Sequence, residues 1–365
     1  MSKKVIISGG GTGGHIYPAI SIANALKIIE PSTEILFVGA QGRMEMEKVP
    51  AAGYKIVGLP IAGIQRSLTL KNLAVPFKLI KSLCEAGRII DEFKPDAVVG
   101  VGGYASGPVL YMANRRGIPT LIQEQNSYAG LTNKILAKKA KRICTAYDGM
   151  ERFFPIKSII KTGNPVRQDL VGLAEKRNDA YHFFKLDPAK KTILVLGGSL
   201  GARTINTTLS LHADILKNQD FQVLWQTGKY NFEDSKKAVA KSGATNIIVM
   251  EFIYNMDYAF AVADVVISRA GAGTISELCL VAKPCILVPS PNVSEDHQTK
   301  NAMALVNADA ALFVSDASCH NRLVEEAIAL VSNEDKCAEL SQNIANLAIS
   351  DSAERIAKEV LSLIK

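Results

Sequence analysis

The sequence has few aromatic residues, no paired cysteines and no long hydrophobic run. Aromatic residues make up 6% of the 365 residues, with one tryptophan, and no basic groove with interleaved aromatics is evident, so nucleic acid is not an expected partner. The six cysteines form no Cys-x-x-Cys pair, which argues against a zinc ribbon and for reduced thiols in a cytosolic protein. No apolar run of about 18 residues occurs, and the N-terminus lacks the apolar core of a signal peptide, so we expect neither a membrane span nor secretion.

The composition is that of a globular protein. Hydrophobic residues make up 48% and charged residues 21%, which is enough for a large core. At roughly 100 to 200 residues per domain, the length predicts two domains. The net charge of +7 allows an anionic partner such as a phosphate or a membrane surface.

Short β-branched apolar runs alternate with helical stretches, which is typical of a parallel sheet with helices on both faces. The expected strands are 4–8, 34–38, 55–59, 97–100, 119–123 and 142–146, then 192–196, 222–226, 247–252, 265–268 and 285–288. The expected helices include 19–30, 133–140, 206–217 and 274–281.

One construction occurs twice, about half a chain apart. An apolar strand runs into the glycine loop 9–14, and a second strand runs into Gly197-Gly198-Ser199-Leu200-Gly201. Two such openings predict an α/β protein with two Rossmann-like domains. We expect an N-terminal domain at 1–165, a second domain at 166–341 and a C-terminal helix at 342–365 that packs back on the first domain.

The first glycine loop has the Gly-x-Gly-x-x-Gly spacing of a dinucleotide site. A nicotinamide site would need an acid at the end of the second strand, whereas this strand continues as Gly39-Ala40-Gln41-Gly42-Arg43. A dehydrogenase is therefore disfavoured. A tight turn that only packs a helix on the sheet explains one or two glycines, but not five in six residues followed by His15.

A third glycine loop, 268–277, follows an expected strand and opens a helix. Thr274 and Ser276 can donate to phosphate oxygens. Glu277, expected in the first helical turn, can accept from the two hydroxyls of a ribose. The alternative is a solvated glutamate that only complements the helix dipole.

Further polar clusters lie next to expected strand ends, at 100–108, 123–126, 162–167 and 295–302. Amide side chains both donate and accept, which suits a neutral polyhydroxyl ligand such as a sugar. The sequence has no Asp-x-Asp, so a diphosphate would be met by helix N-termini, N–H groups and arginine. We expect no metal and no cofactor.

Taken together, these motifs resemble the MurG family, the N-acetylglucosaminyltransferases of peptidoglycan synthesis. The resemblance covers nearly the full chain, in order and approximate spacing. It rests on Gly10–His15 with Pro18-Ala19, Gly102-Gly103-Tyr104, Glu124-Gln125-Asn126, Thr162–Arg167, Gly197-Gly198-Ser199, Ser268-Arg269, Ser276-Glu277-Leu278 and Asp296-His297-Gln298.

This resemblance implies a GT-B fold, with two Rossmann-like domains facing across a cleft. It implies an inverting, metal-independent transfer of N-acetylglucosamine from UDP-N-acetylglucosamine. The acceptor would be the C4 hydroxyl of the muramyl sugar of lipid I (undecaprenyl-pyrophosphoryl-N-acetylmuramyl-pentapeptide), and the product lipid II.

The resemblance also implies a set of substrate-binding residues. These are Thr12, Gly13 and Gly14 by the donor in the N-terminal half, Asn126 on the transferred sugar, Arg167 and Ser199 on the diphosphate side, the Ile253 backbone on uracil, Ala272, Gly273, Thr274, Ile275, Ser276 and Glu277 on diphosphate and ribose, and Gln298 on the sugar hydroxyls. Three positions depart from the family pattern. Gln123 stands where His is usual, Leu200 where Gln is usual and Ala270 where Ser is usual.

Inverting transfer needs a base for the acceptor hydroxyl. His15 ends the first glycine loop, and histidine titrates near neutral pH, so it is the candidate base. Glu124 is the rival, and the sequence leaves the choice open.

A lipid-linked acceptor implies contact with a membrane. Apolar residues at helical spacing lie among lysines in Ile64, Leu70, Leu73, Phe77 and Ile80 with Lys71, Lys78 and Lys81. Such a patch is typical of an interface with anionic lipid. The alternative is a core-facing helix with a solvated basic face.

The implied partners are UDP-N-acetylglucosamine, polyprenyl-linked lipid I, an anionic membrane surface and proteins of cell-wall synthesis. The protein would be peripheral on the cytoplasmic face of the cell (inner) membrane. The alternative functions are a UDP-sugar-dependent diacylglycerol glycosyltransferase, a UDP-sugar epimerase, and a UDP-sugar-binding protein without turnover.

Overall fold

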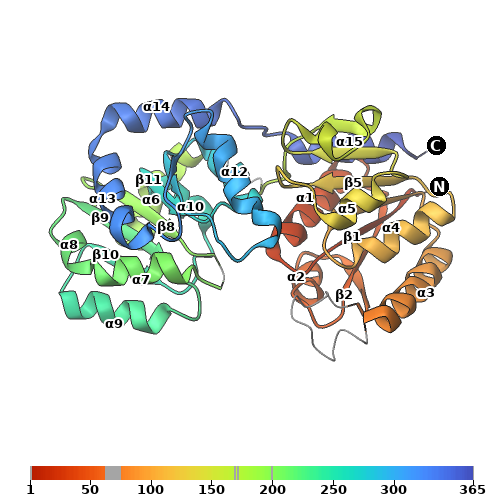
Figure 1. The fold of residues 1–365 in the computed structure, drawn as a ribbon, viewed down its shortest axis with the longest axis horizontal. Helices are drawn as coiled ribbons and strands as arrows, with labels where there is room; N and C mark the ends of the chain where they lie inside the picture. Colours follow the sequence, from red (N-terminus) through yellow and green to blue (C-terminus); the bar gives the residue numbers. More distant parts are fainter. Residues whose placement is uncertain (1, 62–74, 168–169, 171, 199, 365) are drawn as a thin grey trace. The chain divides into compact units, whose positions relative to one another are not determined.

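The structure is a computed structural model that describes residues 2–61, 75–167, 170, 172–198 and 200–364. Its contacts divide the chain into two compact units (Figure 1). Unit 1 is Met1–Arg167 with Ile349–Lys365, and unit 2 is Gln168–Ala348. The division between them thus follows Arg167 rather than the expected Pro165.

Unit 1 contains a parallel sheet in the order β3-β2-β1-β4-β5-β6-β7. Its strands are β1 (Lys4–Gly9), β2 (Glu34–Ala40), β3 (Lys55–Leu59), β4 (Ala97–Gly102), β5 (Thr120–Glu124), β6 (Arg142–Thr145) and β7 (Ile159–Lys161). Its helices are α1 (Gly13–Ile29), α2 (Glu45–Ala51), α3 (Val75–Phe93), α4 (Ser106–Arg115), α5 (Leu131–Leu136) and α15 (Ser352–Ser362).

Helices bury both faces of this sheet. Val5 and Ile7 pack in one cluster with residues of α1 and α15, whereas Ile6 packs in another with residues of α3 and α4. Burial on both faces explains why the strands are continuous apolar runs rather than alternating patterns.

Unit 2 repeats this architecture, with a parallel sheet in the order β10-β9-β8-β11-β12-β13. Its strands are β8 (Lys191–Leu196), β9 (Phe221–Gln226), β10 (Ile247–Met250), β11 (Val265–Ser268), β12 (Cys285–Leu287) and β13 (Leu312–Phe313). Its helices are α6 (Leu173–Phe184), α7 (Arg203–Leu211), α8 (Ala213–Lys217), α9 (Phe232–Ser242), α10 (Met256–Val262), α11 (Ala272–Val281), α12 (His297–Val306), α13 (Cys319–Ser332) and α14 (Glu334–Ala345).

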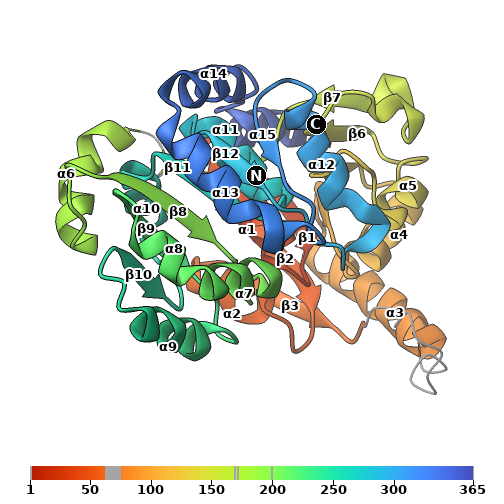
Figure 2. The same ribbon diagram turned by 60° about the vertical axis from the view of Figure 1, so that its left-hand side comes forward.

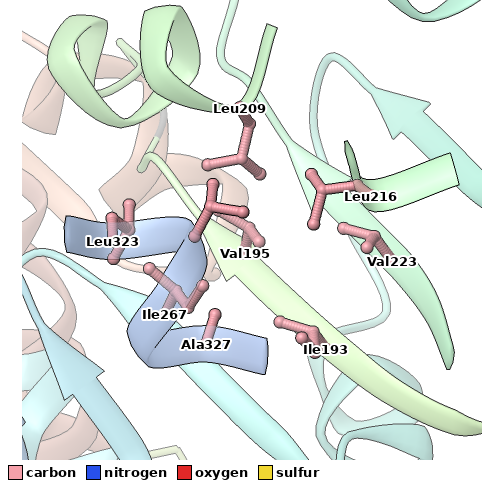
Figure 3. Close-up of a pocket in the computed structure, with 9 residues that line it drawn as sticks. Ile193, Val195, Leu209, Leu216, Val223, Ile267, Leu323 and Ala327 are labelled. Atoms are coloured by element: carbon pink, nitrogen blue, oxygen red, sulfur yellow. The ribbon is translucent and has the colours of Figure 1, made fainter. Parts of the chain in front are cut away.

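The two faces of the unit 2 sheet are covered by different helices (Figure 2). Ile193 and Val195 pack with residues of α7, α8 and α13, and Leu194 and Leu196 pack with residues of α6, α10 and α11. Apolar side chains from β8, α7 and α13 surround a void of about 10 Å³ (Figure 3). Because this void is lined only by apolar residues and has about the volume of one water molecule, it is a packing defect of the core and not a ligand site.

The expected α/β class, with one parallel sheet in each half, is confirmed. Each predicted strand is present, and the sequence missed β7 and β13, which are only three and two residues long. Both lie at a sheet edge. The expected helix 206–217 is two helices, α7 and α8, which are separated at His212.

The sequence predicts one C-terminal helix at 342–365, whereas the structure has the end of α14 and a separate helix, α15, in this range. Gln342 belongs to α14 of unit 2, which ends at Ala345, and the segment that belongs to unit 1 begins at Ile349. Its helix α15 places Ala353, Ile356, Ala357 and Val360 in the cluster that covers α1. Within the described residues, no helix is both long enough and apolar enough to cross a membrane.

Candidate active site

The first glycine loop follows β1 and leads into α1. Because β1 and β4 are neighbouring parallel strands, their carboxyl ends meet, and the loop packs on Gly102 and Gly103. A Cβ atom at Gly103 would lie 2.3 Å from the carbonyl oxygen of Gly10, and one at Gly102 would lie 2.6 Å from Cδ2 of His15. Glycine is therefore required at both positions for backbone and imidazole to approach so closely.

His15 lies in the first turn of α1 and is half-buried. Its Nδ1 is 3.2 Å from Oγ1 of Thr12, the N-cap residue of the same helix. Thr12 and Gly14 are exposed. The structure thus brings Thr12, Gly13, Gly14 and His15 together at a helix N-terminus, where the helix dipole favours a developing negative charge.

Glu124 is buried, and its carboxylate holds the loop that follows β5. Oε1 accepts from the backbone N–H and, at 3.3 Å, the side-chain amide of Asn126. Oε2 accepts from the Gly130 N–H and from Nδ2 of Asn133 at 2.8 Å. Burial raises the pKa of Glu124, and these donors oppose the shift. The acid therefore fixes the half-buried Asn126, the residue that the family resemblance implies at the transferred sugar.

Two of the amide-rich clusters meet in a buried network. Gln123 Nε2 donates to Oδ1 of Asn164 at 3.0 Å, and Asn164 Nδ2 donates to the Gln125 carbonyl at 3.0 Å. Gln125 Nε2 donates to the Val101 carbonyl and to Oε1 of Gln123. These amides therefore bond to one another and to the backbone inside unit 1. Arg167, the last residue of the cluster 162–167, is half-buried and ends this part of unit 1.

The third glycine loop lies in unit 2, between β11 and α11. Gly271 is the N-cap of α11 in an extended conformation, and the helix begins at Ala272, two residues earlier than expected. Glu277 therefore lies in the second turn, not the first. The N–H groups of Ala272, Gly273 and Thr274 have no partner within the helix, which makes this end a suitable anion site.

Side chains in α11 have different environments. Ile275 is buried in the core, so only its backbone can serve a ligand, and Oγ of Ser276 donates to the Ala272 carbonyl at 3.0 Å. Glu277 is half-buried.

Arg269 holds the start of this loop in place. Its Nη1 donates to the carbonyls of Val288 and Pro289 at 3.1 Å and to Oδ1 of Asp316 at 2.5 Å. Asp316 also accepts from Oγ1 of Thr204 at 3.0 Å. The Arg269–Asp316 ion pair is about one-fifth exposed. With Thr204, it links the ends of β11 and β12 to the segment that precedes α13 and to the first turn of α7.

The residues expected at the uracil and the sugar are already partly used. The backbone N–H of Ile253 donates to Oε1 of Gln226 at 3.0 Å, which leaves the Ile253 carbonyl for a base. Gln298 is half-buried, and its Oε1 accepts from the Ser290 N–H at 2.9 Å, which leaves its amide hydrogens as donors.

Gln298 follows a strained segment. Glu295 and Asp296 both have left-handed backbones, with φ of 57° and 50°. Such strain costs about 1–3 kcal/mol per residue and concentrates at functional sites.

A hollow of about 680 Å³ lies between α7 and α9 of unit 2, beside the second glycine loop. No motif in the sequence indicates this hollow. It is lined by Leu200, Gly201, Arg203, Asn206, Thr207, Ser210, Leu211, Tyr230, Asn231, Asp234, Ser235 and Ala238. Asn206 fixes its wall, since its Nδ2 donates to the Thr227 carbonyl and Oδ1 of Asn231 while its Oδ1 accepts from Nε1 of Trp225.

Three of the residues that hold the loops were missed: Glu45, Asn206 and Asp316. The dehydrogenase alternative required an acid in the stretch 39–43. Glu45 comes two residues after this stretch and accepts a hydrogen bond from Gly11 of the first glycine loop. Ser199 lies outside the described residues, and among the described residues no group of three or more metal-ligating side chains occurs.

Part of the expected membrane patch is described. Phe77 and Ile80 on α3 are 76% and 60% exposed, and Lys78 and Lys81 are exposed beside them. Ile64, Leu70, Lys71 and Leu73 lie outside the described residues. The core-facing alternative is therefore wrong for Phe77 and Ile80.

Two Rossmann-like units, each with a glycine loop at the end of its central first strand, are the architecture of the GT-B fold class. Sequence profiles of the glycosyltransferase family 28 N-terminal and C-terminal domains match residues 5–145 and 192–359.

The chain is similar to UDP-N-acetylglucosamine--N-acetylmuramyl-(pentapeptide) pyrophosphoryl-undecaprenol N-acetylglucosamine transferase of Bacteroides fragilis. The two are 59% identical over 362 residues, which are 99% of this chain and 95% of that protein. The chain is 56% identical over 361 residues to the protein of the same name from Cytophaga hutchinsonii, covering 99% and 97%. Its structure is similar to the crystal structure of Acinetobacter baumannii MurG, with a TM-score of 0.79, 29% identity and 99% of both chains covered. The chain belongs to glycosyltransferase family 28 and, within it, to the MurG family.

Proposed function

We propose that this protein transfers N-acetylglucosamine from UDP-N-acetylglucosamine to the C4 hydroxyl of the muramyl sugar of lipid I, with inversion at the anomeric carbon, to give lipid II. The observation that carries the mechanism is the Thr12–His15 pair at the N-terminus of α1. In this pair, a group that can take a proton near neutral pH lies at the end of the first glycine loop, next to Gly102.

In this mechanism Nδ1–H of His15 donates to Oγ1 of Thr12. When Nδ1–H donates to Oγ1 of Thr12, Nε2 carries no proton and can accept one. The C4 oxygen of the acceptor then attacks the anomeric carbon while its proton moves to Nε2. The bond from the anomeric carbon to UDP breaks on the opposite side, and UDP leaves with the electron pair.

Unit 2 supplies the donor-binding groups in this proposal. The N–H groups of Ala272, Gly273 and Thr274 meet the diphosphate, because they lie at a helix N-terminus and have no partner within the helix. The Glu277 carboxylate accepts from the ribose hydroxyls, and the Ile253 carbonyl accepts from the uracil N–H. Gln298 donates to the sugar through its amide hydrogens, and Ser199 adds to the diphosphate side. Arg167, the last residue of this part of unit 1, adds to the diphosphate side as well.

Glu124 is not needed as the base in this proposal. Its two oxygens accept four hydrogen bonds, from Asn126 and Gly130 of the loop after β5 and from Asn133 of α5. To take the acceptor's proton it would have to give up donors that this loop depends on. Its role is to present Asn126 to the transferred sugar.

The test is UDP release by the purified protein, with and without lipid I. We expect release only when lipid I is present, and none with diacylglycerol in its place. Conversion of UDP-N-acetylglucosamine without any lipid would identify an epimerase instead. Binding of UDP with no release under either condition would identify a binding protein without turnover.

We also propose that unit 1 binds the cytoplasmic face of the cell membrane through α3 and α5. The exposed Phe77 and Ile80 lie among lysines on α3. On α5, Leu131 and Ile135 are 73% and 62% exposed on either side of Lys134. Helix α4 packs against both α3 and α5, so these residues come from one group of helices. Apolar anchors among cations favour anionic lipid.

The experiment for this surface is sedimentation with vesicles of phosphatidylglycerol. Phe77→Ser with Lys78→Glu should weaken binding and leave UDP affinity unchanged. The matched control is Ile156→Ser with Lys157→Glu, because Ile156 is also 76% exposed and next to an exposed lysine. Equal binding of both double variants and the parent would contradict the proposal.

A further inference from the structure

Glu45 is an acid that the reaction scheme above does not use. It is the first residue of α2 and is fully buried. Its Oε2 accepts from the backbone N–H of Gly11 at 2.9 Å, and its Oε1 accepts from that of Ala40 at 3.0 Å. Burial of a carboxylate is costly unless the charge is met. Within the described part of the chain, these N–H groups meet it.

The glycines around Glu45 make room for its carboxylate. A Cβ atom at Gly10 would lie 2.1 Å from Oε1 of Glu45, and one at Gly39 would lie 2.6 Å from its Cγ. Gly10 itself touches Gly103, whose neighbour Gly102 touches the His15 ring. The acid is therefore in direct contact with the loop that leads to the proposed base.

The carboxylate lies on the inner side of the first glycine loop. In a dinucleotide site, N–H groups of such a loop are free to meet a phosphate. Here the Gly11 N–H is used by an acid of the chain itself, so it offers nothing to an external anion at that point. What the bond does is fix Gly11, the residue immediately before Thr12, where the chain enters α1.

We propose that Glu45 is a positioning residue for the transfer reaction, which holds the first glycine loop so that Thr12 and His15 keep their geometry at the N-terminus of α1. This inference rests on the proposed role of His15 as the base. Glu45 touches no substrate in this scheme and acts through the Gly11 N–H.

The main variant is Glu45→Gln. The amide has nearly the same size, but one of its two ends is a donor and cannot accept from a backbone N–H. Misplacement of a catalytic group by about 1 Å can cost roughly 100-fold in rate, so we expect kcat to fall about 10- to 100-fold. UDP affinity, measured by calorimetry, should be unchanged. The matched control is Glu47→Gln, because Glu47 lies on the same helix and is exposed.

A double-mutant cycle with His15→Gln separates positioning from general loss of structure. If Glu45 acts through His15, Glu45→Gln should cost less than about threefold once His15 is already Gln. An equal loss in both backgrounds, or no loss in the parent, would overturn the proposal. Should Glu45→Gln not fold, Glu45→Asp keeps the charge, shortens the reach and allows the same cycle.

The single variant His15→Gln keeps the two claims apart. A rate near that of the parent would refute His15 as the base, whatever Glu45 does. A large loss in His15→Gln with none in Glu45→Gln would refute only the positioning role.

Discussion

Removal of the Thr12 hydroxyl tests the tautomer argument directly. Thr12→Val keeps the shape of the side chain and removes the hydroxyl that lies 3.2 Å from Nδ1 of His15. A hydrogen bond of this kind is worth about 0.5–1.5 kcal/mol. If that energy favours the tautomer with an unprotonated Nε2, its loss should lower kcat by about 2- to 12-fold. This is much less than the roughly 100- to 10,000-fold expected when the base itself is removed.

The assay is steady-state transfer, followed as UDP release, with both substrates varied. Thr12→Ser is the control, because it restores the hydroxyl and should recover most of the rate. Neither variant should change UDP affinity, since the proposed uracil, ribose and helix-dipole contacts lie in unit 2. Below the pH at which His15 takes up a proton, the imidazole is a donor at both nitrogens, so the difference between Val and the parent should vanish.

Two results would refute this reasoning. A Thr12→Val rate equal to that of the parent would show that the hydroxyl does not select the reactive tautomer. The same fractional loss in a His15→Gln background would show that Thr12 acts on the substrate and not through the imidazole.

Four further predictions concern unit 2 and the independence of transfer from metal ions. Glu277→Ala should weaken UDP binding by about 1–3 kcal/mol, because it leaves ribose hydroxyls unpaired; unchanged affinity by calorimetry would refute the ribose assignment. Transfer should survive EDTA, and a strict requirement for Mg²⁺ or Mn²⁺ would contradict a diphosphate held by N–H groups. Asp316→Ala should lower the free energy of unfolding of unit 2 by about 3 kcal/mol, since it leaves the mostly buried Arg269 guanidinium unpaired; fluorescence of the single, fully buried Trp225 reports this, and Asp316→Asn should lose less. Burial, with a smaller effect of the Arg177 charge, lowers the pKa of Lys283 to about 8 from 10.5, so its charge opposes folding at pH 7. Lys283→Met should therefore raise the free energy of unfolding by about 1–3 kcal/mol at pH 7, and this gain should fade as the pH rises from 8 towards 10.5; a gain that does not change with pH would contradict it.

The sheets could be predicted because burial on both faces leaves a strong signal. Runs such as Val5–Ile7 and Ile193–Leu196 are apolar at every residue, as a strand covered by helices on both sides requires. The edge strands β7 and β13 carry no such signal, because they are too short and are only partly buried. The sequence predicts the start of α11 two residues too late because Ala272 and Gly273 give no capping pattern, and this places Glu277 in the first turn instead of the second.

The candidate site could be predicted where glycines directly follow a strand. It could be predicted less well where a buried side chain bonds to a distant segment. Gly102 and Gly103 were identified as a motif, but their physical reason, the close approach of Gly10 and His15, needs coordinates. Likewise, nothing in the sequence shows that the Ile253 N–H is already bonded to Gln226. Hydrogen-bond partners between distant segments depend on the packed chain and leave no local pattern.

Three buried or mostly buried acids, Glu45, Glu124 and Asp316, have one use in common. Each accepts hydrogen bonds from loops or side chains that follow parallel strands, where the sheet no longer supplies partners. A carboxylate suits this task because it offers about four acceptor sites from one short side chain. An acid used in this way is a poor general base, since taking a proton would cost it some of the bonds that hold the loop. The geometry that makes Glu45 and Glu124 structural therefore supports the proposal that His15, whose Nδ1 lies 3.2 Å from Oγ1 of Thr12, accepts the acceptor's proton.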